Sequence, residues 1–267
     1  MNIDEVLEQA QTDLFWLADD VRVVDRPEIL YLSCDRPQDY LNVVLRFTAE
    51  DARIPALVAE TDEAHATVAS KWTLSRGNRR AGVERALLAG GYAPSQELSA
   101  YAIGVDAYRP RATPDVAVRA VTDIGALRQW VDVGARAFNR SGDTNEERLA
   151  AELARSNAPD ARVHRFIAYD RITDAPLCAA GLSVFPSLRF GLLWAGGTVP
   201  EGRGRGAYSA VVAARLERAR LLGIAAVGLY ARVDTSAPIV AQQGFERHGA
   251  VTHWMRPARH LIALSGR

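Results

Sequence analysis

Cysteine, lysine and net charge are all scarce in this 267-residue sequence. Its two cysteines, Cys34 and Cys178, lie far apart and outside any CxxC pair. They allow at most one disulfide, exclude a disulfide framework, and favour isolated buried thiols. The 32 basic residues balance 32 acidic ones, so the basic excess of a non-specific nucleic-acid binder is missing. Lys71 is the only lysine, which indicates GC-rich bacterial coding.

Long apolar runs are also missing. No stretch of about 18 uninterrupted apolar residues occurs, so we expect no membrane-spanning segment. The first residues, MNIDEVLEQA, have neither the basic nor the apolar region of a secretory signal. We therefore expect a cytoplasmic protein that has no membrane or nucleic-acid partner. The remaining composition, 48% hydrophobic and 24% charged, is that of a globular chain with one large or two modest domains.

The chain divides into two halves at a predicted linker. Residues 108–116 (YRPRATPDV) carry two prolines and no apolar periodicity. We therefore expect a first domain at 1–108 and a second at 115–260. Periodicity predicts, in the first half, helices at 3–18, 50–66 (with Thr48 as N-cap) and 80–89 and strands at 28–34, 41–47, 71–75 and 97–105. In the second half it predicts strands at 116–121, 165–169, 176–184, 190–199, 224–233 and 247–256, and helices at 123–138, 145–155, 207–222 and 236–243.

The most informative segment is a glycine-rich turn within residues 192–216 (LLWAGGTVPEGRGRGAYSAVVAARL). A predicted strand leads into this turn and a predicted helix follows it. The first N–H groups of a helix lack intrahelical partners and attract anions, and glycine lets a phosphate approach the backbone. Arg203 and Arg205 add positive charge suited to phosphate. The turn therefore predicts a phosphate or diphosphate site, and the competing interpretation is a flexible surface turn with two solvated arginines.

Two common phosphate-binding loops fit this turn poorly. A Walker A loop requires Gly-Lys-Ser/Thr, which does not occur. The Rossmann fingerprint is formally met by Gly202-x-Gly204-x-x-Ala207, but no acidic residue follows within residues 223–228, where the ribose ligand is expected. Asp234 comes too late, and too little chain follows the turn for a full dinucleotide domain. An NAD-binding domain is therefore the weaker alternative.

Two motifs follow one another in the second half. Val199 ends a strand, and four residues later the chain reads Arg203-Gly204-Arg205-Gly206-Ala207-Tyr208. A strand, a short helix and Gly244-Phe245 then follow within residues 229–249. In this order and at this separation, residues 116–257 resemble the GNAT superfamily of acetyl-CoA-dependent N-acetyltransferases. Tyr208 departs from the family signature, Arg/Gln-x-x-Gly-x-Gly/Ala, where a small residue follows.

The resemblance implies a mixed α/β fold, with an α+β sheet whose splayed parallel strands surround acetyl-CoA. It implies an acyltransferase that moves an acetyl or other acyl group from this co-substrate to a primary amine, without a metal ion. The amine belongs to a small molecule or peptide, and its binding surface is expected at residues 138–147. The resemblance implies that the Gly197 N–H contacts the thioester carbonyl and that backbone groups of Thr198 and Val199 contact the pantetheine arm. It implies that the pyrophosphate is bound by the N–H groups of Arg203, Gly204, Arg205, Gly206, Ala207 and Tyr208. Ser236 is a further implied cofactor contact, for which a plain helix N-cap is the alternative.

No catalytic residue can be assigned from the sequence. In many family members a tyrosine four residues before the Gly-Phe glycine protonates the leaving thiolate, but Val240 stands there. Tyr230 or Tyr208 could substitute, although packing roles fit both. His253 on the last strand is a possible base, with a structural histidine as the alternative. The missing tyrosine motivates a rival function, a non-catalytic CoA-binding or regulatory protein.

The two halves share one order of elements. Gly91-Tyr92 and Gly244-Phe245 both follow short helices and lie 153 positions apart. At that offset the strand at 71–75 matches the one at 224–228, which predicts two tandem GNAT-like domains. In the first half, Thr48-Ala49-Glu50-Asp51-Ala52-Arg53 replaces the phosphate turn, without glycine and with two acids. We therefore expect the first domain to be degenerate, and the sequence leaves the oligomeric state open.

Overall fold

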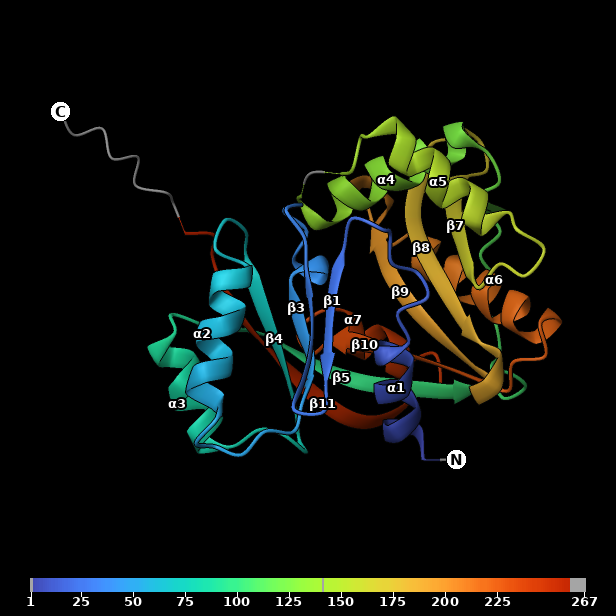
Figure 1. Cartoon of the computed structure of the whole chain (residues 1–267). Helices are drawn as coiled ribbons and strands as arrows, with labels where there is room; N and C mark the ends of the chain where they lie inside the picture. The colour runs from blue at the N-terminus through green and yellow to red at the C-terminus, as the bar shows by residue number, and fades with distance from the viewer. Residues whose placement is uncertain (1, 141, 260–267) are drawn as a thin grey trace. The chain divides into compact units, whose positions relative to one another are not determined.

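The computed structural model of the protein describes residues 2–140 and 142–259 (Figure 1). Contacts divide the chain into two compact units. Unit 1 consists of the described residues of Met1–Ala10, Tyr101–Tyr230 and Pro238–Arg247. Unit 2 consists of the described residues of Gln11–Ala100, Ala231–Ala237 and His248–Arg267. The expected domains, 1–108 and 115–260, are the two copies of a repeated fold, whereas the two units are defined by contacts. The limits of the two copies stay a prediction.

Unit 1 contains a mixed sheet in the order β10-β9-β8-β7-β6. Neighbours from β6 to β9 are antiparallel, whereas β10 runs parallel to β9. β8 is almost wholly buried, as expected for a central strand with both faces covered. The strands are β6 (Val116–Ala120), β7 (Val163–Asp170), β8 (Pro176–Phe185), β9 (Phe190–Thr198) and β10 (Ala226–Arg232), the last of which ends in unit 2.

Helices cover both faces of this sheet. Helix α4 (Ile124–Phe138) contacts β8 and β9, and α5 (Glu146–Ser156) contacts β7 beside it. Helix α6 (Ala207–Leu221) contacts β6 to β9. A Cβ built on Gly196 would meet α6, and one built on the next residue, Gly197, would meet α4. Since successive strand residues point to opposite faces, α4 and α6 lie on opposite sides of the sheet.

Two predicted helix boundaries near the N-terminus are wrong. Helix α1 is Ile3–Thr12 and not 3–18. Leu14 and Leu17, which fall within the predicted helix, pack instead in a separate cluster of unit 2. Helix α2 begins at Ile54 and not at residue 50, and the side chain of Thr48 donates to the Pro27 carbonyl at 2.8 Å instead of capping it.

Unit 2 also contains strands that pair in both parallel and antiparallel directions. β1 to β3 are antiparallel neighbours, and β4 is parallel to β3. β1 was not predicted, because its burial pattern is that of an exposed, charged edge strand. Fully buried Trp72 lies at the centre of the core with Leu57 and Leu87. The elements are β1 (Arg22–Arg26), β2 (Ile29–Ser33), β3 (Val43–Phe47), α2 (Ile54–Ala64), β4 (Ser70–Ser75), α3 (Ala81–Ala89) and β5 (Ala93–Gly104), which continues into unit 1.

The last strand in the described part of the chain also belongs mostly to unit 2. β11 (Glu246–Arg256) pairs antiparallel with β4, from Val251 opposite Ser75 to Arg256 opposite Ser70. The buried Arg256 side chain donates to the His65 carbonyl at 3.0 Å and forms an ion pair with Asp62 at 2.6 Å. The sheet of unit 2 therefore includes a strand from the far end of the sequence.

The repeated order of elements predicted from the sequence is present in the structure. β3, α2, β4 and α3 follow one another as do β9, α6, β10 and α7 (Ser236–Ala241), and each strand pair is parallel. Both short helices stop at a left-handed glycine, Gly91 (φ 80°) and Gly244 (φ 88°). In each case the next residue, Tyr92 or Phe245, donates its N–H to the carbonyl five residues back.

Candidate functional site

A bulge interrupts strand β9. Ala179 on β8 pairs with Gly197, but Gly181 pairs with Trp194, so Ala195 and Gly196 both lie opposite Ala180. Ala195 adopts a φ of 49°, a left-handed conformation that is uncommon for a residue with a side chain. Such bulges re-aim backbone groups and concentrate next to active sites.

Shortly before the bulge, β9 and β10 stop pairing. Their parallel register covers Phe190 with Ala226, Gly191 with Val227 and Leu192 with Gly228. From Leu193 to Thr198, β9 has no register partner on β10 among the described residues. β9 and β10 therefore diverge along this segment, as the predicted splayed strands do. The edge of β9 that faces away from β8 offers unpaired backbone groups there.

The glycine-rich turn connects this free edge to helix α6. Gly204 and Gly206 adopt φ values of 74° and 78°, which explains why glycine occupies both positions. Gly206 precedes Ala207, the first residue of α6, and no side chain caps this helix start. The first N–H groups of α6 therefore have no side-chain acceptor, as an anion site requires. The N–H of Arg203 differs, since it donates to the Pro200 carbonyl at 3.3 Å.

The two arginines of the turn differ in their partners. Arg205 is ion-paired with buried Asp170 at the end of β7. Hydrogen bonds from the Thr173 backbone and from Arg205 hold the pKa of Asp170 well below its usual value. Arg203 is exposed and has no ion pair among the described residues. The uncompensated positive charge at the turn therefore belongs to Arg203.

Contacts restrict the residues predicted for the pantetheine arm and the thioester. Val199 donates its N–H to the Leu177 carbonyl at 2.9 Å, and its own carbonyl accepts from Gly202. A Cβ on Gly197 would lie 2.8 Å from both Ala137 and Phe138, so only glycine fits beneath α4. Because hydrogen-bonding direction alternates along an antiparallel strand, the backbone groups of Thr198 point away from β8.

The buried thiol of Cys178 lies opposite Thr198 on the neighbouring strand. Burial raises its pKa to about 11, against hydrogen bonds from the Thr198 side chain and the Gly197 backbone. The Gly197 backbone, which the sequence suggested for the thioester carbonyl, is thus also close to the sulfur. Cys178 and Cys34 are both free and buried, which confirms the prediction of isolated thiols.

Ser236 does not lie in the unit that holds the turn. It belongs to unit 2, where its hydroxyl oxygen accepts the Arg232 N–H at 2.9 Å and closes the connection between β10 and α7. This contact differs from the N-cap expected as its alternative role. Its assignment to the cofactor stays a prediction.

The possible acids and bases have contrasting environments. Val240 is fully buried at the position of the family tyrosine. Burial raises the pKa of Tyr230, with smaller effects from Glu8 and Asp4. His253 lies in unit 2, where burial and nearby Lys71 lower its pKa to about 4, so its imidazole is neutral at neutral pH.

Sequence reasoning missed the most unusual side chain near the bulge, Arg215. It is 1% exposed on α6 and lies close to Gly196 and Tyr208. A signal was present, because Arg215 is spaced three residues from Val212 and seven from Tyr208. That spacing places a charged residue on the same face of the predicted helix as Tyr208 and Val212.

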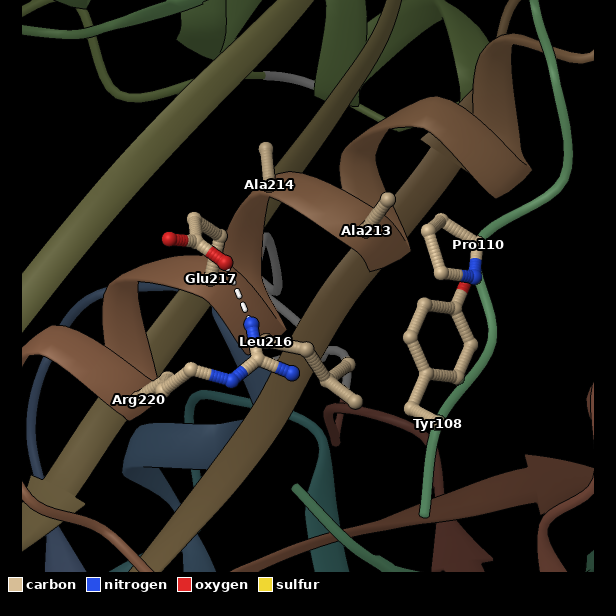
Figure 2. Close-up of a pocket in the computed structure, with 7 residues that line it drawn as sticks. All are labelled: Tyr108, Pro110, Ala213, Ala214, Leu216, Glu217 and Arg220. Carbon is tan, nitrogen blue, oxygen red and sulfur yellow. Dashed lines mark hydrogen bonds and ion pairs between the residues drawn. The ribbon is translucent and has the colours of Figure 1, made fainter. Parts of the chain in front are cut away.

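A shallow cavity of about 290 Å³ lies along the C-terminal half of α6 (Figure 2). Tyr108 and Pro110 face Ala213 and Ala214 across it, and Glu217 and Arg220 form an ion pair at its edge. It is distinct from the glycine-rich turn, which contributes no lining residue. Among residues 2–140 and 142–259, no helix is long and apolar enough to cross a membrane, and no group of three His, Cys, Asp or Glu side chains suits a metal ion.

Solved structures share this architecture. A GCN5-related N-acetyltransferase from Kribbella flavida matches with a TM-score of 0.72 and 17% identity, over 98% of both chains. The chain therefore has the GNAT fold. A GCN5-related N-acetyltransferase from Sphaerobacter thermophilus matches with a TM-score of 0.62 and 17% identity, over 89% of this chain and 77% of that one. A tandem GNAT protein from the clavulanic acid biosynthesis pathway matches with a TM-score of 0.61 and 13% identity, over 94% and 87%.

These likenesses confirm the predicted mixed fold of two tandem GNAT-like copies. No protein-family model matches the sequence, and no curated protein sequence does either. At 13–17% identity the matches concern the fold, which supports acyl transfer only in general terms.

Proposed function

We propose that this protein transfers an acetyl or other acyl group from acetyl-CoA to a primary amine of a small molecule or peptide. One observation carries the proposal: a bulged strand with a free edge runs directly into a left-handed glycine turn and an uncapped helix. The free edge suits an extended amide chain, and the helix start suits a diphosphate. Acetyl-CoA contains both groups, an extended amide-containing pantetheine arm and a diphosphate.

In this proposal the N–H groups of residues 204–208 hold the pyrophosphate, and the Arg203 side chain adds charge. Thr198 offers its outward-pointing backbone groups to the pantetheine arm, whereas both backbone groups of Val199 have backbone partners, Leu177 and Gly202, and fix the end of the strand. The alternation that turns Thr198 outward turns the Gly197 N–H towards β8, so the N–H that can polarise the thioester carbonyl is that of Thr198. Gly197 supplies the lack of a side chain that lets the strand pass beneath α4. The amine then attacks the carbonyl carbon, and the C–S bond breaks to release the thiolate. We keep the expected cytoplasmic location, without membrane or nucleic-acid partners.

A second function is favoured by Val240, which is fully buried where many GNAT enzymes carry a tyrosine. A chain without a proton donor for the thiolate could bind CoA without catalysing transfer. Binding and turnover separate the two proposals. Acetyl-CoA at about 100 times its dissociation constant should stabilise the fold by about 2.7 kcal/mol, and NAD should not.

The decisive experiment measures free-thiol release from acetyl-CoA with a panel of primary amines, alongside thermal unfolding with each ligand. Amine-dependent thiol release supports the acyltransferase. Stabilisation by acetyl-CoA without release with any amine supports the non-catalytic alternative. Stabilisation by NAD and not by acetyl-CoA would contradict both.

A further inference from the structure

Arg215 is a buried cation without a counter-charge. Its side chain is 1% exposed, and it forms no ion pair with any described carboxylate. Its Nε donates to the Val211 carbonyl at 3.0 Å, and its Nη1 donates to the Gly181 carbonyl at 3.2 Å. Its Nη2 is buried and has no hydrogen-bond partner in the described structure.

Burying an unpaired charge in this way lowers the stability of the folded protein. Arginine stays protonated in proteins, and a buried charge is normally paired with an opposite charge. Well-packed apolar residues can often replace a buried ion pair without loss of stability. The two carbonyl contacts use only part of the guanidinium. The unpaired Nη2 therefore indicates a role for the charge beyond packing.

This charge lies beneath the bulge of β9. A Cβ built on Gly196 would be 3.7 Å from Arg215 Nη2 and 2.8 Å from the Tyr208 ring carbon Cε2. Gly196 is partly exposed at the free edge of β9, and Tyr208, at the second position of α6, is partly exposed as well. The aromatic ring and the cation thus meet on one side of the strand that borders the proposed thioester site.

We propose that Tyr208 is the proton donor for the departing thiolate, and that Arg215 is the positioning residue whose charge stabilises the phenolate left behind. This inference rests on the proposed acyl transfer. The amine attacks, the C–S bond breaks, and the thiolate sulfur takes the Tyr208 hydroxyl proton. The phenolate then regains, through solvent, the proton that the attacking amine loses.

The surroundings of Tyr208 agree with this role. The titratable and charged groups that face it are Arg215 on its own helix, Cys178 on β8 and Tyr108 on the segment after β5. Burial raises the pKa of Tyr208, and the Arg215 guanidinium opposes that rise. Cys178 and Tyr108 both have raised pKa values and are neutral at neutral pH. Arg215 is therefore the one charge among these groups that can stabilise a phenolate.

The test is a double-mutant cycle on the full-length protein, with kcat, KM for acetyl-CoA and thermal unfolding measured for every variant. We expect Tyr208→Phe to lower kcat by about 100-fold or more, with little change in KM. Arg215→Gln should lower kcat about tenfold or more, Arg215→Lys should recover part of the loss, and the double variant should be no slower than Tyr208→Phe alone. Arg218→Gln, three residues further along α6, and Tyr40→Phe, in unit 2, are the matched controls and should keep the activity of the unaltered chain.

Each result decides the inference. A folded Tyr208→Phe variant with full kcat overturns it, and so do additive losses from the two substitutions or a loss in Arg215→Gln that follows only its unfolding temperature. Failure of the proposed function looks different, because the unaltered chain would then acylate no amine. The inference would fall with it, without any variant being involved.

Discussion

The guanidinium of Arg205 is ion-paired with the carboxylate of Asp170, the last residue of β7. One Asp170 oxygen also accepts the N–H groups of Ile172 and Thr173, both at 2.8 Å. This arginine is therefore bound to the hairpin between β7 and β8. Arg203, two residues earlier, has no ion pair in the described part of the chain. The two arginines should consequently differ in their contribution to ligand binding.

Arg203→Gln should weaken acetyl-CoA binding more than Arg205→Gln does. A charge-assisted hydrogen bond contributes about 1.5–3 kcal/mol, so losing one at Arg203 should reduce affinity by about 10- to 150-fold. The Arg205 charge is already compensated by Asp170, and its removal should cost about threefold or less in affinity. Calorimetric titration of both variants measures the difference, and equal losses would contradict it.

A negative charge placed in the turn should weaken binding of the diphosphate. Gly204 is left-handed, and a Cβ there would meet no atom within 4 Å, so Asp and Asn are tolerated equally well. Gly204→Asp should bind acetyl-CoA about tenfold more weakly than Gly204→Asn, a difference of about 1.4 kcal/mol. This pair isolates charge from shape. Gly206→Glu should lose about 10- to 150-fold in affinity, but Thr113 lies 3.0 Å from its added Cβ, so strain contributes too.

The stability of the hairpin beside the turn should depend on acid pH. Hydrogen bonds from the Thr173 backbone and from Arg205 lower the pKa of Asp170, so its contribution is complete above the unfolded pKa of about 3.9. That contribution is lost as pH falls through the lower folded pKa. Asp170→Asn should therefore lower the unfolding temperature at neutral pH, and the gap from the unaltered chain should narrow at acid pH. Asp106→Asn, whose side chain is 97% exposed, is the control and should show no such dependence.

One acetyl-CoA molecule should bind per chain. In the first copy, α2 follows Glu50 and Asp51, without the left-handed glycines of the second copy. Asp51 is paired with Arg80 at 2.9 Å, but a phosphate about 4 Å from Glu50 would be repelled by about 4 kcal/mol at an effective dielectric near 20. Calorimetry on the full chain should give one site. A stoichiometry of two would show that the first copy has kept its phosphate site.

Sequence patterns predicted most of the fold because its helices and buried strands have regular apolar periods. The helix expected at 207–222 is Ala207–Leu221, and the strand expected at 71–75 is Ser70–Ser75. The errors come from tertiary context. β1 pairs with β2 although its side chains are largely exposed, and the apolar residues after Thr12 join a core different from that of α1.

The part of the site that the sequence predicted is the turn, because its backbone conformation requires glycine. The left-handed conformations of Gly204 and Gly206 follow from a turn that must be glycine-rich. The partner of Arg205 was not predictable, because Asp170 lies 35 positions earlier and approaches only when β7 has its place in the sheet. The burial of Arg215 likewise depends on the carbonyl of Gly181, 34 positions away.

Strand β11 makes the order of synthesis matter for folding. Residues 70–75 leave the ribosome long before residues 251–256, their partners in the antiparallel ladder. Elements of unit 2 that are made early must therefore wait with an unpaired edge on β4 until residues 251–256 have emerged. An unpaired strand edge is a template for association with other chains. We expect the newly made N-terminal half to depend on this late strand, so that truncation before β11 promotes aggregation of the half that was already complete.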